Sequence, residues 1–236
     1  LRCAQKEVCI MGAAAGPNVV EDGLVLALDS VNTKSHSGQY TYNWYDLINN
    51  IHFTGYFSPQ WNTTFNSTHY NGSNEYYENS SGWTSFGTDP FSIEIWFRAH
   101  TQSSAETIIG NNNTGTGTFD ISFNSSAKIK FWAQDSGGGY ANAVSSTILN
   151  VWEHLIFVRE GTGTNQFKIY KDGSLDGTGT VNTDFNSTAQ LRIARSRNGS
   201  YYYDGDLSLV RIYKNKALTA AEVEQHYNAT KGRYIN

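Results

Sequence analysis

Residues 205–234 read GDLSLVRIYKNKALTAAEVEQHYNATKGRY, and this stretch decides the fold. In its first part Leu207, Val210 and Ile212 are closely spaced, which is typical of a strand with a buried face. The spacing changes phase after Leu207, which predicts a β-bulge near Ser208. We therefore expect the stretch to open with a long, buried and bulged strand.

The second part of the same stretch predicts a helix over 220–230. Residues 219–222 (TAAE) form a capping box, in which the Thr hydroxyl and the Glu carboxylate each accept a hydrogen bond from a free backbone N–H. Leu218 and Val223 occupy the two positions of a hydrophobic staple, and Gly232 is placed to cap the carboxyl end. We expect this to be the only helix of the chain.

The rest of the chain predicts strands. Residues 91–98 are the clearest, because apolar and polar residues alternate there with a period of two. The Asp-Gly pair at 172–173 is a hairpin signal. Many short strands without helices between them are typical of a sandwich. The other strands are predicted at 24–28, 52–57, 65–70, 74–78, 107–109, 118–123, 128–133, 152–159, 166–171 and 191–195.

The stretch 205–234 resembles the closing strand and helix of laminin-G-like domains, which belong to the concanavalin A-like lectin/glucanase superfamily. It is most similar to the versions found in structural proteins of tailed phages, marine ones especially. The segments 22–29 (DGLVLALD), 91–97 (FSIEIWF), 152–154 (WEH) and 170–173 (YKDG) fit the same pattern in the same order. The resemblance implies an all-β fold, a two-sheet antiparallel jelly-roll sandwich with one short C-terminal helix, of a kind that usually binds glycans or proteins.

Length and composition limit the partners. The chain has 236 residues, enough for one β domain, which we place at 18–236. Aromatic residues make up 14% and charged residues 16%, a balance that excludes a disordered chain. The net charge is −4 and no basic stripe occurs, so nucleic acid is not an expected partner. No apolar run approaches the roughly 18 residues of a membrane helix, so membrane insertion is not predicted.

Residues 1–17 are predicted to form an N-terminal leader or a flexible arm. Residues 6–8 (KEV) can be encoded by a bacterial ribosome-binding sequence, at a suitable distance before Met11, the only methionine. We therefore expect the natural protein to start at Met11; the alternative is a genuine arm. Cys3 and Cys9 both lie in this segment, so no disulfide framework is expected in the domain.

Aromatic side chains are the candidate ligand-binding residues, because flat rings suit the faces of sugars. Tyr201, Tyr202 and Tyr203 are consecutive in a Gly- and Ser-flanked loop, where three rings cannot all be buried. They are predicted to contact a ligand; the alternative is that one ring plugs the end of the sandwich and the others lean on neighbours.

A second candidate platform lies on the polar faces of two strands. Trp96 and Trp132 each alternate with core residues, together with Glu94, Arg98 and Lys130. If these faces form the concave surface of a sheet, the five side chains make a glycan-binding platform. The alternative is that the two indoles pack beneath a loop or against a partner subunit.

A calcium site is a weaker candidate. The resemblance implies that Ca²⁺ is often bound, and Asp29, Asp204 and Asp206 could meet at one end of the sheets as oxygen ligands. No EF-hand-like string supports the site, and carboxylates beside turns usually cap backbone N–H groups. The six histidines show no metal-binding spacing such as H-x-x-x-H.

Catalysis is not predicted. The resemblance implies that glucanases of this fold use closely spaced acids on one strand, in the pattern E-x-D-x-x-E. Glu94 has no acidic partner two or four residues on, and Glu153 is likewise alone. No G-x-S-x-G motif, P-loop or cysteine nucleophile occurs in the domain.

The sequence therefore favours a non-catalytic glycan-binding or adhesion module of a phage particle. Its expected partners are host-surface glycans and other virion proteins of the capsid or tail, and its expected display is multivalent or homo-oligomeric. The expected location is the virion surface, after assembly in the bacterial cytoplasm, or otherwise an extracellular setting. The alternatives are a capsid or tail decoration protein that binds no sugar and, less favoured, a glycoside hydrolase.

Overall fold

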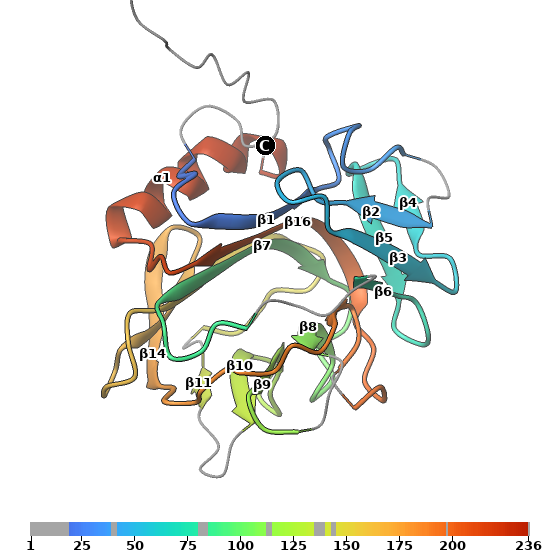
Figure 1. Cartoon of the computed structure of the whole chain (residues 1–236). Helices are drawn as coiled ribbons and strands as arrows, with labels where there is room; N and C mark the ends of the chain where they lie inside the picture. Colours follow the sequence, from blue (N-terminus) through green and yellow to red (C-terminus); the bar gives the residue numbers. More distant parts are fainter. Residues whose placement is uncertain are drawn as a thin grey trace, which may run out of the picture.

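Strand β16 (Asp204–Lys214) runs through the middle of one sheet of the computed structural model (Figure 1). The structure describes residues 19–38, 42–79, 85–111, 115–134, 140–142, 145–196 and 198–235. The predicted leader or arm of residues 1–17 lies outside them. The fold is an all-β sandwich of two antiparallel sheets with one short C-terminal helix, which confirms the predicted fold class.

The back sheet is built around β16 and β7 (Phe91–Ala99), which pair along most of their lengths. The opposite edge of β16 is shared, since β5 pairs with its first half and β1 with its second half. The remaining strands follow in the order β14, β13, β12 beside β7 and β4 beside β5. Their bounds are β1 (Leu24–Asp29), β4 (Gln60–Asn62), β5 (Ser67–Asn71), β12 (Trp152–Arg159), β13 (Phe167–Lys171) and β14 (Ser174–Thr180).

The front sheet has the order β2, β3, β6, β15, β8, β9, β10, β11. Strand β11 also pairs with β14, so the two sheets are joined along one edge. In Figure 1 the front-sheet strands β8 to β11 lie below β7 and β16. Their bounds are β2 (Asn43–Tyr45), β3 (His52–Tyr56), β6 (Tyr76–Asn79), β8 (Thr107–Asn111), β9 (Thr118–Phe123), β10 (Ile129–Gln134), β11 (Tyr140–Asn142) and β15 (Leu191–Ile193).

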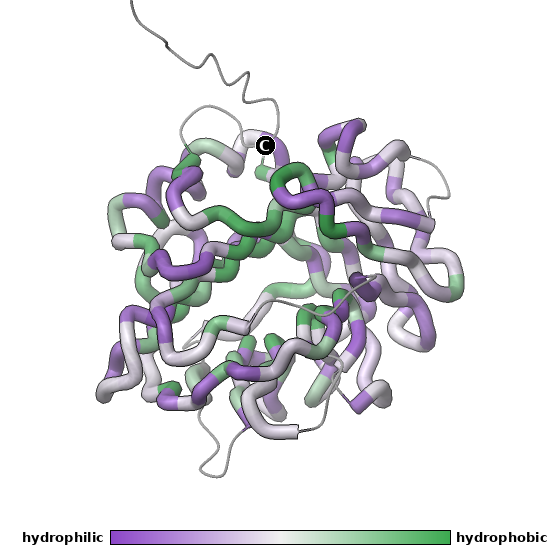
Figure 2. Tube along the Cα trace, viewed as in Figure 1, coloured by the Kyte–Doolittle hydropathy of each residue, from purple (hydrophilic) through white to green (hydrophobic). Residues whose placement is uncertain are grey.

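The main core fills the space between the two sheets. Phe91, Ile93, Ile95 and Phe97 of β7 all point into it, as their alternation predicts. Apolar residues accordingly gather on the central strands in Figure 2. The hydrophobic effect of this burial is the main stabilising contribution to the sandwich.

Helix α1 (Ala220–Thr230) covers the outer face of the back sheet. Val223 packs with Ile156 and Tyr213 in a second apolar cluster, on the side of the sheet away from the main core. The capping box is present, with Thr219 accepting from the backbone N–H of Glu222. No helix in the described part of the chain is long and apolar enough to span a bilayer.

Two local predictions about the closing stretch have different outcomes. The bulge is confirmed, because the register between β16 and β7 shifts between Leu207 and Leu209. The predicted cap at Gly232 is wrong: α1 ends at Thr230 with Lys231 as its C-cap, and the chain continues into a 3-10 helix, Lys231–Arg233. Lys231 keeps a right-handed helical conformation there, so no left-handed glycine is needed to end the helix.

Several strand boundaries differ from the prediction by one or two residues. The predicted strand at 65–70 begins only at Ser67, because Asn66 adopts a left-handed conformation (φ 49°) in the turn between β4 and β5. Strands β2, β4 and β11 were not predicted, since each has three residues and shows no clear alternation. The hairpin turn is confirmed, with positive φ at Asp172 and Gly173 between β13 and β14.

Histidine 36 gives the domain a pH-dependent stability. Its ring is buried, lies 4.7 Å from the ring of Trp61 in a stacked arrangement, and burial lowers its pKa from 6.5 to about 4. The unfolded chain therefore binds one more proton between these two pH values, and stability falls as pH drops from about 6.5 to about 4. We expect this one group to lower the free energy of unfolding by up to about 3 kcal/mol across the window.

The His36→Gln variant, which does not titrate, tests this expectation. Urea unfolding at a series of pH values should show a flatter slope between pH 6.5 and 4 for the variant than for the parent chain. An equal slope in the two proteins would contradict the assignment to His36.

Candidate functional site

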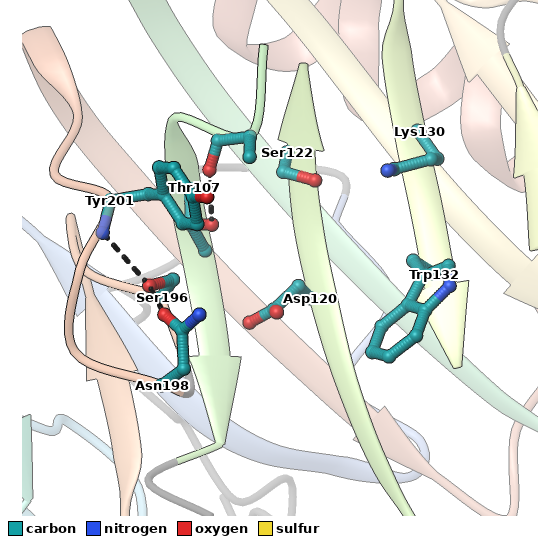
Figure 3. A pocket seen from close by; sticks show the side chains of 9 residues that line it. Thr107, Asp120, Ser122, Lys130, Trp132, Ser196, Asn198 and Tyr201 are labelled. Carbon is teal, nitrogen blue, oxygen red and sulfur yellow. Dashed lines mark hydrogen bonds between the residues drawn. The ribbon is translucent and has the colours of Figure 1, made fainter. Parts of the chain in front are cut away.

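A hollow of about 170 Å³ lies on the outer face of β8, β9 and β10, beside the loop between β15 and β16. Figure 3 shows its side chains converging from both the strands and the loop. The polar floor residues Asp120 and Ser122 are buried, whereas Tyr201 is 45% exposed at the rim. The lining residues are Ala105, Thr107, Asp120, Ser122, Lys130, Trp132, Ser196, Asn198 and Tyr201.

Strand pairing places the floor residues side by side. Asp120 lies opposite Trp132, and Ser122 lies opposite Lys130, in the register of β9 and β10. Residues directly opposite each other share a face, so these side chains form two adjacent rows on the outer surface. Every second residue of β9 points the other way, into the main core. The sheet therefore presents the four side chains in a fixed arrangement.

The loop that forms the other wall is held by Ser196. Its buried hydroxyl accepts hydrogen bonds from the backbone N–H groups of Ser200 (3.2 Å) and Tyr201 (3.0 Å). It also donates to the side-chain oxygen of Asn198 at 2.6 Å. Gly199 supplies the left-handed conformation of the turn (φ 76°). These contacts fix the backbone on which the Tyr201 ring is carried.

The three predicted tyrosines separate. Tyr201 lines the hollow, and Tyr202 is half-buried outside it, with the guanidinium of Arg195 5.3 Å above its ring. Tyr203 is fully buried in the main core, where its hydroxyl donates to the backbone oxygen of Asp206. The prediction of ligand contact is wrong for Tyr203, because its ring is buried in the main core beside Tyr70.

The residues of the predicted tryptophan platform lie in different places in the structure. Trp132 and Lys130 stand together in the hollow, as their alternation on β10 predicts. Trp96 and Glu94 do not reach an open surface, and their predicted place in a platform is wrong: both are fully buried beneath α1. The Trp96 indole N–H donates to the Thr230 hydroxyl at 2.8 Å. Trp96 packs beneath a helix, whereas the alternatives considered for it were a covering loop or a partner subunit.

Arg98 lies apart from the hollow, in a cluster around Asp206. Its Nη1 is 2.6 Å from Asp206 Oδ2, and His100 Nε2 is 3.0 Å from the same oxygen. Burial would raise the pKa of Asp206, but the hydrogen bonds from His69 and Asn62 outweigh it and lower that pKa. Arg98 is therefore an ion-pair partner here and not part of a platform with Trp132.

The three aspartates predicted to bind calcium do not form one site. Asp29 accepts hydrogen bonds from Arg233 at 2.8 Å and from the backbone N–H of Val31 at 3.0 Å. Asp204 and Asp206 both lie beside His100, at 3.5 Å and 3.0 Å from its two ring nitrogens. Within the described ranges, the one group of residues with metal-ligand geometry is His69, His100 and Asp206. The prediction of an oxygen-only calcium site is therefore not supported for Asp29.

Charge within the hollow is mixed. Lys130 is half-buried, and burial lowers the pKa of its ammonium, while the nearby Asp120 carboxylate acts in the opposite direction. The hollow thus combines an acceptor, Asp120, with a donor, Lys130, and two aromatic side chains.

Gly110 makes room for the Asp120 carboxylate. The two residues are paired between β8 and β9, and a Cβ at position 110 would overlap Asp120 Oδ1. We expect Gly110→Ala to push that carboxylate from its place and to weaken ligand binding at the hollow by about tenfold, the effect of one lost charge-assisted hydrogen bond. Titration with a glycan ligand measures the change.

Gly232→Ala is the matched control for that substitution. No heavy atom lies within 4 Å of a Cβ built at Gly232, so its affinity and stability should match the parent. Unchanged affinity of the Gly110→Ala variant would contradict a role for the Asp120 carboxylate.

Sequence reasoning missed the floor of the hollow. Asp120 and Ser122 alternate with core residues of β9, and that period of two was a signal that could have revealed them. Ser196 and Asn198 lie in a loop whose path depends on tertiary contacts, and no local pattern marks them.

Solved structures share this fold. Domain 4 of an extracellular GH43 arabinanase from Geobacillus stearothermophilus, in complex with arabinotriose, has a TM-score of 0.65 and 16% identity, covering 88% of this chain and 100% of its own. The binding domain of botulinum neurotoxin DC, in complex with SialylT, has a TM-score of 0.63 and 18% identity, covering 88% of this chain and 51% of its own.

The Trypanosoma rangeli sialidase, in complex with sialic acid, has a TM-score of 0.63 and 13% identity, covering 91% of this chain. The chain thus spans the whole arabinanase domain but only 34% of the sialidase. At such identities the likeness concerns the fold. No curated protein matches the sequence significantly.

A family model settles the relationship. The model described as concanavalin A-like lectin/glucanases superfamily, Laminin_G_3, matches residues 71–224, well over half of the chain. The matched segment runs from the end of β5 into α1 and includes both walls of the hollow. The chain therefore belongs to the concanavalin A-like lectin/glucanase superfamily, as a laminin-G-like domain.

Proposed function

We propose that the chain is a non-catalytic glycan-binding module whose site is the hollow between Trp132 and Tyr201. The observation that carries the proposal is the pairing of two accessible aromatic side chains with a floor of polar ones. Sugar rings have apolar C–H faces that stack on aromatic rings and hydroxyl edges that need polar partners. Both kinds of surface meet here.

The polar groups supply both an acceptor and a donor of hydrogen bonds for sugar hydroxyls. Asp120 supplies carboxylate oxygens that accept from a sugar O–H, and Lys130 supplies an ammonium that donates to a sugar oxygen. The volume of about 170 Å³ is below the roughly 300–1,000 Å³ of pockets that enclose drug-sized ligands. It fits one ring of a glycan whose remainder extends over the surface.

The lining favours binding over hydrolysis. Asp120 is the one carboxylate among the residues that line the hollow. Canonical glycoside hydrolysis by either stereochemical route needs two carboxyl groups that flank the bond to be cleaved. Glu94, considered as a lone acid from the sequence, is buried under α1. We therefore expect no cleavage of a bound glycan.

The structural relatives are consistent with this proposal. The arabinanase domain is in complex with arabinotriose, and the neurotoxin binding domain is in complex with SialylT. Relatives also include a sialidase, so hydrolysis is the competing function to be tested.

The biological setting that we propose is the surface of a tailed-phage virion, where the module contacts glycans of the host cell. A small and open site gives weak binding for one copy, and several linked copies raise the overall affinity. Multivalent or homo-oligomeric display, through attachment to capsid or tail proteins, would supply those copies. Immunoblotting of purified particles tests this location.

A decoration protein without sugar binding is the second candidate. It is favoured by one turn, 148–151, in which Ile148, Leu149 and Val151 are 60%, 44% and 45% exposed. Neighbouring exposed apolar side chains are typical of protein-contact surfaces. Such a turn would attach the module to a particle whether or not the hollow binds a glycan.

A glycan-array scan of the multimerised chain, with calcium and then with chelator, tests the proposed function. Reproducible binding to a defined set of glycans is the expected result. A blank array with folded protein would contradict glycan binding and leave the decoration protein as the stronger candidate. Incubation of the bound glycans with the chain, followed by an assay for new reducing ends, should show no release; sustained release would contradict the non-catalytic assignment.

A further inference from the structure

We propose that His69, His100 and Asp206 form a binding site for a divalent transition-metal ion such as Zn²⁺. One donor atom of each residue lies within 4.8 Å of the others. His69 is on β5, Asp206 is on β16, and His100 directly follows β7, so three adjacent strands of the back sheet supply the ligands. This site lies outside the hollow and stands independently of the proposed glycan binding.

Backbone pairing fixes the ligands in place. Asp206 lies opposite His69 in the register of β16 and β5, and opposite Arg98 in the register of β16 and β7. The backbone N–H of His100 donates to the backbone oxygen of Asp204 at 3.0 Å. Ligands on paired strands are held more precisely than ligands on loops, which lowers the entropic cost of binding an ion.

The distances are close to those between ligands of one metal ion. His69 Nδ1 is 3.4 Å from Asp206 Oδ1, and His100 Nε2 is 3.0 Å from Asp206 Oδ2, so each imidazole faces a different oxygen of the carboxylate. Zinc bonds of about 2.0–2.2 Å in a tetrahedron place neighbouring ligand atoms roughly 3.3–3.6 Å apart. Two imidazole nitrogens beside one carboxylate are ligands that zinc prefers, whereas calcium prefers oxygen alone.

A second shell of side chains orients these ligands. Asp204 Oδ1 lies 3.5 Å from His100 Nδ1, the ring nitrogen that faces away from Asp206. A carboxylate in this place favours the proton on Nδ1 and Nε2 as the electron-pair donor, as in carboxylate–histidine–zinc arrangements. Asn62 supports Asp206 in the same way, because its amide donates to Oδ1 at 3.1 Å.

Arg98 marks the place of the cation. Its Nη1 lies 2.6 Å from Asp206 Oδ2 and 3.2 Å from His100 Nε2, between two of the three ligands. An acceptor pair of this kind needs a positive charge, and the guanidinium supplies it when no metal is bound. A metal ion therefore competes with Nη1 of Arg98, a side chain whose Nε also donates to the backbone oxygen of Asn150.

The cluster is open to solvent on one side. The side chains of His69 and His100 are 32% and 25% exposed, whereas that of Asp206 is fully buried. An ion has a route to the ligands, and a water molecule can complete a fourth coordination position. The Arg98 side chain is 16% exposed, which gives the displaced guanidinium a route outward.

Metal titration of the full chain tests the site. Cys3 and Cys9 are replaced with serine first, since thiolates bind zinc themselves. Calorimetry with Zn²⁺ and the absorption spectrum with Co²⁺ then report affinity and geometry. We expect one ion per chain and the intense visible bands of tetrahedral cobalt.

Single substitutions identify the ligands. His69→Ala and His100→Ala should each weaken binding by at least about tenfold, and His52→Ala, a half-buried histidine of the front sheet, should not. Arg98→Met should strengthen binding by roughly 10- to 100-fold, because a competing charge-assisted hydrogen bond is lost.

The outcomes are decisive. Loss of the cobalt bands in both histidine variants, together with tighter binding by Arg98→Met, supports the site. It is overturned if the cysteine-free chain takes up no ion, if either histidine variant binds like the parent, or if Arg98→Met binds no more tightly. Circular dichroism of each variant shows that it is folded before titration.

Discussion

Replacing Glu94 with glutamine is expected to lower the free energy of unfolding by about 3–5 kcal/mol. Glu94 is fully buried, and both its oxygens lie 3.1 Å from Nη1 of the equally buried Arg211. His154 Nε2 is 3.0 Å from one oxygen and His226 Nδ1 is 2.9 Å from the other. An amide leaves the guanidinium without its counter-charge, and an unpaired buried charge is far more costly than an unpaired surface one.

The same network ties three parts of the chain together. Glu94 is on β7, Arg211 is on β16 and His226 is on α1, and His226 Nε2 in turn accepts from the backbone N–H of Val20 at 2.9 Å. Because Nε2 is an acceptor, the ring proton sits on Nδ1 and is donated to Glu94. The substitution therefore weakens the docking of the helix and of the N-terminal end of the domain as well.

Chemical denaturation and thermal melting measure the effect, with a fall in midpoint of roughly 6–20 °C for a domain of this size. Glu224→Gln, an exposed position on α1, is the matched control and should change stability by less than about 0.5 kcal/mol. The double variant Glu94→Gln with Arg211→Met should be more stable than Glu94→Gln alone, because no unpaired charge remains. A double variant that sums the two single losses would contradict this account.

Lowering the pH should also reduce the stability that this network contributes. Burial would raise the pKa of Glu94, but the Arg211 charge and the two histidine contacts outweigh it and hold the pKa well below its ordinary value. The stability that Glu94 contributes is therefore complete above its unfolded pKa of roughly 4.3 and is lost as pH falls toward the folded value. That window lies below the one expected for His36.

The alternation of β7 predicted which of its residues share a face but not what covers each face. Phe91 and Ile93 were correctly placed in the core, because the period of two depends only on local strand geometry. Trp96 was predicted to be accessible because its face carries Ser, Glu and Arg as well. That face is covered by α1, through contacts such as the one between Trp96 and Thr230, which are 134 positions apart in the sequence. The polar residues on the covered face pair with one another, as Glu94 does with Arg211.

Only the part of the candidate site that depends on local strand geometry could be predicted from the sequence. Lys130 and Trp132 follow from the alternation of β10, and Tyr201 follows from an aromatic loop between polar residues. Strand order was needed to bring β8 and β9 beside them, and strand order is a tertiary property. The metal cluster is a further case, since His69 and His100 are 31 residues apart in sequence and meet only through the pairing of β5, β16 and β7.

Removing the indole of Trp132 should cost the module most of its affinity for glycans. Trp132 lies beside Asp120 on the floor of the hollow and faces the same open side as Tyr201. An aromatic anchor at the centre of a binding site typically contributes about 2 kcal/mol or more when truncated to alanine, which corresponds to roughly a 30-fold weaker Kd. We expect Trp132→Ala to show that loss, measured by titration with the strongest ligand of the array.

Two comparisons separate a binding role of Trp132 from a structural one. Trp132→Phe keeps a flat ring and should recover part of the affinity, whereas Tyr42→Ala removes a ring that is 68% exposed outside the hollow and should leave the Kd unchanged. The indole is partly exposed on the outer face of β10, so its loss leaves the main core intact and the thermal midpoint close to that of the parent. A Trp132→Ala variant that is folded and binds like the parent would move the site away from the hollow, because the two rings that flank it are the surfaces on which a sugar would stack.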